Sequence, residues 1–142
     1  MKKTAILLIM FVMGAFVAQA QTVTGKWKTI DDETGEPKSI VEIYEKNGKI
    51  YGKVIEILNP AKKDAKCTNC KGDEKDKPIL GLVIIKGLSK DGSEWSGGQI
   101  LDPNKGKSYK CTISLDGKDK LNVRGYVGIS LLGRTQTWHR VQ

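Results

Sequence analysis

The 142-residue sequence predicts an all-β protein, a single eight-stranded antiparallel barrel of the up-and-down type. Apolar and polar residues alternate with a period of two through most of the chain after residue 20. Turn-forming pairs such as Asn47-Gly48 and Asp116-Gly117 recur at short intervals. No window after residue 20 shows the 3.6-residue periodicity of an amphipathic helix. A meander of this length removes its exposed edges by closing on itself, so we expect a barrel, with a two-sheet sandwich as the alternative.

The clearest element is the hairpin at residues 39–57, with the sequence "SIVEIYEKNGKIYGKVIEI". Counting outward from its two-residue type I′ turn pairs Tyr44 with Tyr51, Glu42 with Lys53, and Val41 with Val54. This register places Val41, Ile43, Ile50 and Val54 on one face of the hairpin. The remaining strands are expected at residues 23–30, 79–89, 94–101, 108–115, 119–128 and 131–141.

One connection is much longer than the others. Residues 59–78, "NPAKKDAKCTNCKGDEKDKP", carry six lysines and four acids and almost no apolar side chains. We call this segment the lysine-rich loop. Connections of this length within a compact domain are usually functional or disordered. We expect the lysine-rich loop to lie over one mouth of the barrel.

The first twenty residues have the pattern of a secretory signal peptide. Lys2 and Lys3 precede the apolar run "TAILLIMFVMGAFV", and the small-x-small site Ala18-Gln19-Ala20 follows. Cleavage near Ala20 leaves residues 21–142 as one β-barrel domain. The apolar run is shorter than the roughly 20 residues that a membrane-spanning helix needs, and no second run follows. We therefore expect an exported protein, periplasmic or extracellular, without a transmembrane segment.

The charge pattern argues against nucleic acid as a partner. The formal net charge of +8 falls to +6 when Lys2 and Lys3 are removed. The other basic residues are scattered among sixteen acids, with neither a basic helix nor an RNA-binding motif. An anionic ligand, a lipid head group or a cell-surface polymer fits this surplus better, and a solvated surface is the simplest explanation.

Cys67 and Cys70 have the Cys-x-x-Cys spacing of zinc sites, thiol oxidoreductases and small disulfides. A closed zinc site needs four ligands, and the chain adds only Cys111 and His139, so no metal is expected. The lysines nearby favour a thiolate, which leaves redox exchange open, although the motif does not open a helix. A link to Cys111 would gain more chain entropy, but Cys67 and Cys70 are always neighbours. We expect a Cys67–Cys70 disulfide, which suits an exported protein, with Cys111 a buried free thiol.

Residues at the two ends of the predicted barrel resemble a known closure. In calycin barrels (lipocalins, fatty-acid-binding proteins and their relatives), a Gly-x-Trp on the first strand meets an arginine from the last strand. The guanidinium then stacks on the indole and shuts one end. Gly25, Trp27 and Arg140 resemble this arrangement.

The mature chain also resembles the bacterial domain of unknown function 2147 family of small exported proteins. The matching stretches are "GKWKTIDDETGEPKSIV", "CTNCKGDEKDKPILGL", "WSGGQILDPNKGKSY" and "LNVRGYVGISLLGRTQTWHR". The resemblance implies a calycin-like or lipocalin-like barrel in the periplasm or outside the cell. It implies no particular activity.

Two sets of side chains on late strands are candidates for ligand binding. Arg124-Gly125-Tyr126 has the Arg-x-Tyr spacing with which fatty-acid-binding proteins grip a carboxylate. Alternation instead puts Leu121, Val123 and Val127 on the apolar face, so that Arg124 and Tyr126 point outward unless the interior is polar. The second set is Arg134, Gln136, Trp138 and Arg140, which share one face and either line a mouth or stack outside the wall.

Other polar residues do not predict chemistry. Asp31-Asp32-Glu33 is contiguous, whereas calcium loops alternate their oxygen ligands, so we interpret this run as a solvated turn. The single histidine, His139, has no nucleophile and orienting group in a recognisable arrangement. We expect neither catalytic residues nor a cofactor.

The sequence therefore predicts a non-enzymatic exported barrel that binds a small apolar or amphipathic molecule, with an anionic ligand as one option. The alternative is an envelope interaction or structural module whose barrel is filled with side chains and whose outer face meets a protein or polymer. A continuous internal cavity would favour binding, and a solid interior would eliminate it.

Overall fold

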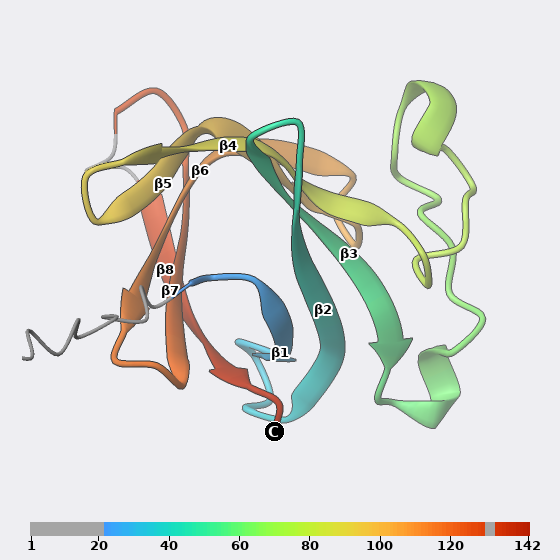
Figure 1. Cartoon of the computed structure of the whole chain (residues 1–142). Helices are drawn as coiled ribbons and strands as arrows, with labels where there is room; N and C mark the ends of the chain where they lie inside the picture. Colours follow the sequence, from blue (N-terminus) through green and yellow to red (C-terminus); the bar gives the residue numbers. More distant parts are fainter. Residues whose placement is uncertain (1–21, 130–132) are drawn as a thin grey trace, which may run out of the picture.

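The computed structural model of the chain describes residues 22–129 and 133–142, and the predicted signal peptide at residues 1–20 lies outside them. The described residues form a closed antiparallel barrel in which strands follow one another in sequence order (Figure 1). The predicted fold class is confirmed. The strands are β1 (Gly25–Ile30), β2 (Pro37–Lys46), β3 (Lys49–Ile57), β4 (Val83–Asp91), β5 (Glu94–Asp102), β6 (Lys107–Asp116), β7 (Lys120–Tyr126) and β8 (Gly133–Arg140). Two single-turn 3-10 helices, η1 (Pro60–Lys62) and η2 (Gly72–Glu74), lie in the lysine-rich loop.

The β2–β3 hairpin has the register that the sequence predicted. Val41 pairs with Val54, Glu42 with Lys53, and Tyr44 with Tyr51. The turn residues Asn47 and Gly48 have φ angles of 53° and 77°, as a type I′ turn requires. The four apolar residues assigned to one face of this hairpin are all buried.

Some strand boundaries differ from those expected. The strand expected at residues 79–89 begins only at Val83, because the residues before it form a turn. In that turn the Leu82 amide donates to the Ile79 carbonyl, and the Gly81 amide donates to the Val54 carbonyl. Of the strand expected at residues 131–141, the structure describes the part from residue 133 onward.

The meander gives the barrel two distinct ends. The connections 31–36, 58–82 and 103–106 and residues 127–129 after β7 lie at one end, which we call the open end. The turns 47–48, 92–93 and 117–119 lie at the other, which we call the closed end, together with the start of β1 and the end of β8. Fully buried apolar side chains fill the barrel from the closed end to its middle: Trp27, Val41, Ile43, Ile85, Leu88, Ile113 and Leu121.

The middle of the lysine-rich loop packs on the outside of the barrel, beside β3 and β4 (green in Figure 1). The Asn69 side-chain amide donates to the Asn104 carbonyl in the β5–β6 turn at 2.9 Å. Glu74 accepts from Lys86 on β4 at 2.7 Å, which forms an ion pair. The middle of the loop therefore docks on the β5–β6 turn at the rim and on the outer face of β4, beside the mouth. This corrects the expectation that the loop lies over a mouth, since only Asn59, Lys62, Ala65 and Ile79 of the loop line the cavity.

Candidate functional site

The closed end is sealed by a stack between the first and last strands. The Arg140 guanidinium carbon lies 4.2 Å from the centre of the Trp27 ring. The same guanidinium donates three hydrogen bonds to backbone carbonyls, from Nε to Lys118 at 2.7 Å, from Nη1 to Thr24 at 3.0 Å and from Nη2 to Thr22 at 2.9 Å. A cation over an indole face is attracted by the ring's quadrupole, so charge and shape both close this end.

Gly25 leaves the space that this arrangement needs. Its φ of +130° lies where residues with a side chain are strained. A Cβ atom at this position would come within 2.8 Å of Arg140 Nη1. The structure thus brings Gly25, Trp27 and Arg140 together, in the arrangement that the calycin resemblance implied.

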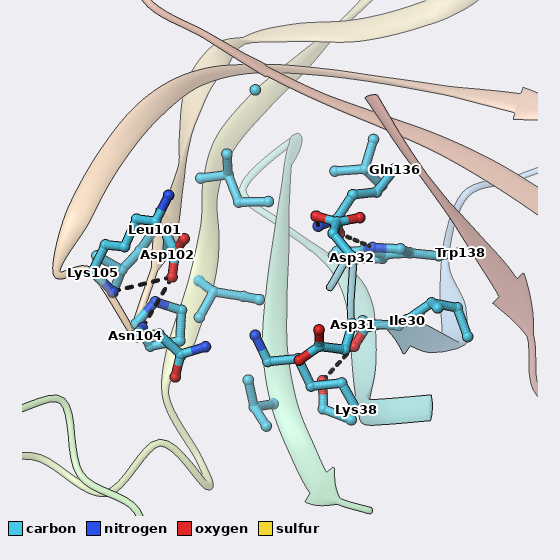
Figure 2. A pocket seen from close by; sticks show the side chains of 18 of the residues that line it. Ile30, Asp31, Asp32, Lys38, Leu101, Asp102, Asn104, Lys105, Gln136 and Trp138 are labelled. Atoms are coloured by element: carbon cyan, nitrogen blue, oxygen red, sulfur yellow. Dashed lines mark hydrogen bonds between the residues drawn. The ribbon is translucent and has the colours of Figure 1, made fainter. Parts of the chain in front are cut away.

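The open end contains a cavity of about 1220 Å³. Its apolar lining comes from side chains on several strands: Val54, Ile57, Ile84, Ile100, Val123 and Trp138. Charged side chains of both signs surround it: Asp31, Asp32, Glu33, Glu36, Lys38, Lys62, Asp102, Lys105 and Arg134. In Figure 2, Asp32 and Gln136 face Asp102 and Lys105 across this space. The barrel interior is therefore packed toward the closed end and hollow at the open end.

The last strand lines the cavity with its inward face. Arg134, Gln136 and Trp138 alternate along β8 and all border the cavity, and the Trp138 side chain is 2% exposed. The residues between them form their hydrogen bonds on the other face of β8, where Thr135 accepts from Arg124 and Thr137 bonds to Asn122. Of the two arrangements open from the sequence, the structure places Arg134, Gln136 and Trp138 at the mouth. Arg140, the fourth member of the series, lies at the closed end instead, stacked on Trp27.

The Arg-x-Tyr pair is not assembled at the cavity. Arg124 is absent from the residues that line it and donates to Thr135 Oγ1 at 3.0 Å. Tyr126 borders the cavity, and so does Gly125, which lies between the two residues in the sequence. Val127, expected on the apolar inner face, is 64% exposed because β7 ends at Tyr126. The carboxylate site proposed for Arg124 and Tyr126 therefore lacks its geometry.

A polar chain at the mouth could not be found from the sequence. Both Arg134 and Gln136 donate to one oxygen of Asp32, and the Gln136 contact measures 2.6 Å. The Trp138 indole N–H donates in turn to Gln136 Oε1 at 3.0 Å (Figure 2). Asp32, which the sequence assigned to a solvated turn, thus connects the β1–β2 loop to β8. More than 100 residues separate these partners, and no local pattern predicts such a pairing.

The neighbouring carboxylate, Asp31, organises its own turn. Backbone N–H groups of Glu33 and Thr34 donate to Asp31 Oδ1 at 2.8 and 3.2 Å. These two bonds lower the pKa of Asp31 below its usual value, and the positive charges of Lys38 and Lys62 lower it further. Asp31 is therefore ionised at neutral pH and contributes a fixed negative charge to the rim.

The cysteines divide into a disulfide and a thiol. Cys67 and Cys70 form a disulfide, and both residues are buried in the apolar cluster beneath the lysine-rich loop. Cys111 is a free cysteine on the inward face of β6, and burial raises its pKa to about 12. Within residues 22–129 and 133–142, no three His, Cys, Asp or Glu side chains gather closely enough to hold a metal ion.

A closed eight-stranded meander of this kind, packed at one end and hollow at the other, is a lipocalin-like barrel. Residues 25–140 match the family described as "Uncharacterized protein conserved in bacteria (DUF2147)", and the chain belongs to this family. A solved structure described as "Protein HP1028 from the human pathogen Helicobacter pylori belongs to the lipocalin family" is similar in fold, with a TM-score of 0.77. The two chains are 22% identical over 87% of this chain and 85% of the other. A search of curated proteins finds no match.

Proposed function

We propose that the protein is a non-enzymatic binding protein that holds one small apolar or amphipathic molecule in the cavity at the open end. The observation that carries the proposal is a hollow of about 1220 Å³ in a barrel whose other end is sealed by Trp27 and Arg140. Barrels of this size are just wide enough to hold one small ligand when side chains do not fill them. A side-chain-filled interaction module accounts less well for a hollow of this volume.

The lining supports an amphipathic ligand. Isoleucine, valine and tryptophan side chains form the wall, whereas charges of both signs surround the opening. An apolar portion of the ligand gains free energy by leaving water, at about 25 cal/mol per Å² buried. A polar portion keeps its hydration or forms hydrogen bonds at the rim. This division favours a molecule with one apolar part and one polar end.

The reactive groups of the chain support binding rather than catalysis. The buried Cys111 thiol has a raised pKa and is a poor nucleophile at neutral pH. His139 pairs with Lys28 across the β1–β8 ladder and is not among the residues that line the cavity. We therefore place the function in the cavity and assign no catalytic residue.

We also propose that the protein acts outside the cytoplasm. The Cys67–Cys70 disulfide supports this location, because such bonds persist in oxidising compartments. The signal-peptide pattern at residues 1–20 gives independent support. Within the described residues, no helix is both long and apolar enough to cross a membrane.

Gly125 offers a way to fill the cavity without straining the barrel. A Cβ atom at Gly125 would meet Ile100 and Tyr109 at 3.5 Å, which is ordinary contact. Gly125→Leu should therefore place a side chain in the lumen. Ser114→Leu adds the same side chain to the neighbouring strand β6, at a residue that does not line the cavity.

The test is fluorescence titration with N-phenyl-1-naphthylamine, a neutral apolar probe. We expect saturable one-to-one binding by the wild type and by Ser114→Leu, with affinity at least about tenfold weaker for Gly125→Leu. Native mass spectrometry of protein purified from its own host should show a stoichiometric small molecule. Absence of probe binding by the wild type, together with repeated absence of a copurified compound, would instead support the interaction module.

A further inference from the structure

Two donors at the mouth converge on a single carboxylate oxygen. Arg134 and Gln136, two residues apart on the inward face of β8, both donate to Asp32 Oδ2. A guanidinium beside an amide NH₂ group is a favourable pair of donors for a carboxylate. Both donors border the cavity, so the carboxylate that they hold stands at the entrance.

The orientation of Gln136 is fixed from inside the barrel. An indole N–H can only donate a hydrogen bond, and Trp138 Nε1 donates to Gln136 Oε1 at 3.0 Å. Because the amide oxygen is held there, the Gln136 NH₂ group must point toward the mouth. The Trp138 side chain is 2% exposed, so this orientation is set by a buried residue. The donor for an acceptor at the mouth is therefore arranged in advance.

The carboxylate of Asp32 can be replaced without unfolding its loop. The β1–β2 turn is held by hydrogen bonds from the Asp31 amide to the Glu36 carbonyl and from the Gly35 amide to the Asp31 carbonyl, each 2.8 Å. Asp31 Oδ1 accepts two further backbone hydrogen bonds. The side chains of Arg134 and Asp32 are 66% and 32% exposed, and ion pairs this exposed contribute little to stability.

We propose that Arg134 and Gln136 bind the carboxylate of a single-chain amphiphile such as a fatty acid, and that Asp32 occupies this position until the ligand arrives. The chain of the amphiphile then lies along the apolar wall that begins at Trp138. This inference rests on the proposed binding function, which it makes specific by naming the head group. The other acids of the rim oppose it by repulsion, so the test compares head groups of both signs.

The experiment measures displacement of N-phenyl-1-naphthylamine by dodecanoate, dodecanol and dodecyltrimethylammonium below their micellar concentrations. The wild type should bind dodecanoate more tightly than the other two. Asp32→Asn should bind dodecanoate several-fold more tightly, because the competing charge is gone. Arg134→Met should bind it about tenfold or more weakly, since a charge-assisted hydrogen bond is lost. Both variants should bind dodecanol with an affinity within about twofold of that of the wild type.

Two further variants test whether net charge alone accounts for dodecanoate binding and whether Gln136 takes part in it. Lys118→Met removes one positive charge from the exposed closed-end turn and should leave dodecanoate binding unchanged. Gln136→Glu keeps an oxygen for the Trp138 N–H but puts a negative charge where the ligand carboxylate would bind. It should therefore lower the affinity for dodecanoate more than the affinity for dodecanol. Thermal unfolding checks that each variant is folded.

The failures of the two proposals differ. Equal affinities for dodecanoate and dodecanol, unaffected by Arg134→Met and Gln136→Glu, would overturn the head-group assignment and leave the cavity as a binding site. The head-group assignment would also be overturned if dodecyltrimethylammonium bound most tightly of the three. That result would show that the acids of the rim bind a cationic head group. A wild type that binds neither the probe nor any of the three amphiphiles would overturn the binding function itself.

Discussion

The Arg140 guanidinium lies 4.2 Å from the centre of the Trp27 ring, and the same two residues are ladder partners between β8 and β1. The β1–β8 ladder contains one other pair, Lys28 with His139. The β6–β7 ladder, by comparison, extends from Lys110 to Asp116. Because this ladder is short, the side-chain interactions of Arg140 contribute to holding β8 against β1.

Arg140→Met should destabilise the barrel strongly. The substitution removes the cation over the indole and three hydrogen bonds to backbone carbonyls. We expect the free energy of unfolding to fall by about 2–4 kcal/mol, as measured by urea denaturation followed by circular dichroism. Lys118→Met, an exposed substitution in the closed-end turn, should change it by less than about 0.5 kcal/mol. If Arg140→Met lowered the free energy of unfolding by as little as Lys118→Met, the short ladder would close the barrel without the stack of Arg140 on Trp27.

Gly25→Ala, a substitution on β1, should also destabilise the closed end, because the added methyl group lies against Arg140 of β8. Gly25 has a φ of +130°, and an added Cβ would lie 2.8 Å from Arg140 Nη1. Gly117→Ala is a control for a positive φ without a steric overlap, because Gly117 has a φ of +68° and nothing lies within 4 Å of its added Cβ. We expect about 1–2 kcal/mol of destabilisation for Gly117→Ala from the backbone alone, and at least about 1 kcal/mol more for Gly25→Ala. Equal losses in urea denaturation would argue that Arg140 moves aside freely.

The fold could be predicted from the sequence because the patterns that indicate it involve residues close together in the chain. Alternation and turn residues depend on neighbours only a few positions apart, and the register of the β2–β3 hairpin followed from Asn47-Gly48 alone. Closure was predicted from the resemblance of Gly25, Trp27 and Arg140 to the calycin arrangement and not from a local pattern, since these residues lie near the two ends of the described chain. The start of β4 was missed because the apolar residues Ile79 and Leu82 resemble a strand, although their backbone amide and carbonyl join in a turn.

The candidate site was less accessible because its contacts are distant along the chain. The shared face of Arg134, Gln136 and Trp138 followed from alternation, but its direction did not, since both faces of β8 carry polar residues. The role of Asp32 depends on partners 102 and 104 residues away. The position of the lysine-rich loop depends on Asn69 and the β5–β6 turn, and composition alone indicated neither.

Cys111 should be unreactive in the folded protein. Burial raises its pKa from 9.0 to about 12, so the thiolate is scarce at pH 8 and the sulfur is inaccessible. We expect no reaction with 5,5′-dithiobis(2-nitrobenzoate) at pH 8 until urea unfolds the chain, when one thiol should react. Rapid reaction under native conditions would contradict the buried position of Cys111 on β6.

The raised pKa of Cys111 also predicts a dependence of stability on pH. The unfolded chain releases the thiol proton near pH 9, whereas the folded chain keeps it to about pH 12. The thiol's contribution to the free energy of unfolding is therefore complete below pH 9 and is lost as pH rises between these values. Cys111→Ala should reduce the decline of stability with pH in this window, as measured by urea denaturation at a series of pH values. An unchanged decline would assign it entirely to other groups.

Gly106→Ala should detach the lysine-rich loop from the barrel. A Cβ at Gly106 would overlap the Asn69 carbonyl, which is backbone and cannot turn aside. Gly92→Ala is the control, because Gly92 has a similar φ of +61° against +66°, and nothing lies within 4 Å of its added Cβ. Both variants lose backbone freedom, so this effect largely cancels when they are compared. We expect the free energy of unfolding, measured by urea denaturation, to fall by about 1–3 kcal/mol more in Gly106→Ala than in Gly92→Ala.

The same variant should expose the disulfide. Cys67 and Cys70 are 0% and 3% exposed while the loop is docked, so a reductant reaches them only when the loop opens. Reduction by dithiothreitol, followed by alkylation and mass spectrometry, should be several-fold faster in Gly106→Ala than in Gly92→Ala. If ligand binding stays unchanged after reduction, the disulfide serves to hold the loop and is not needed for binding. Equal reduction rates in the two variants would show that contacts other than the one between Gly106 and Asn69 hold the loop.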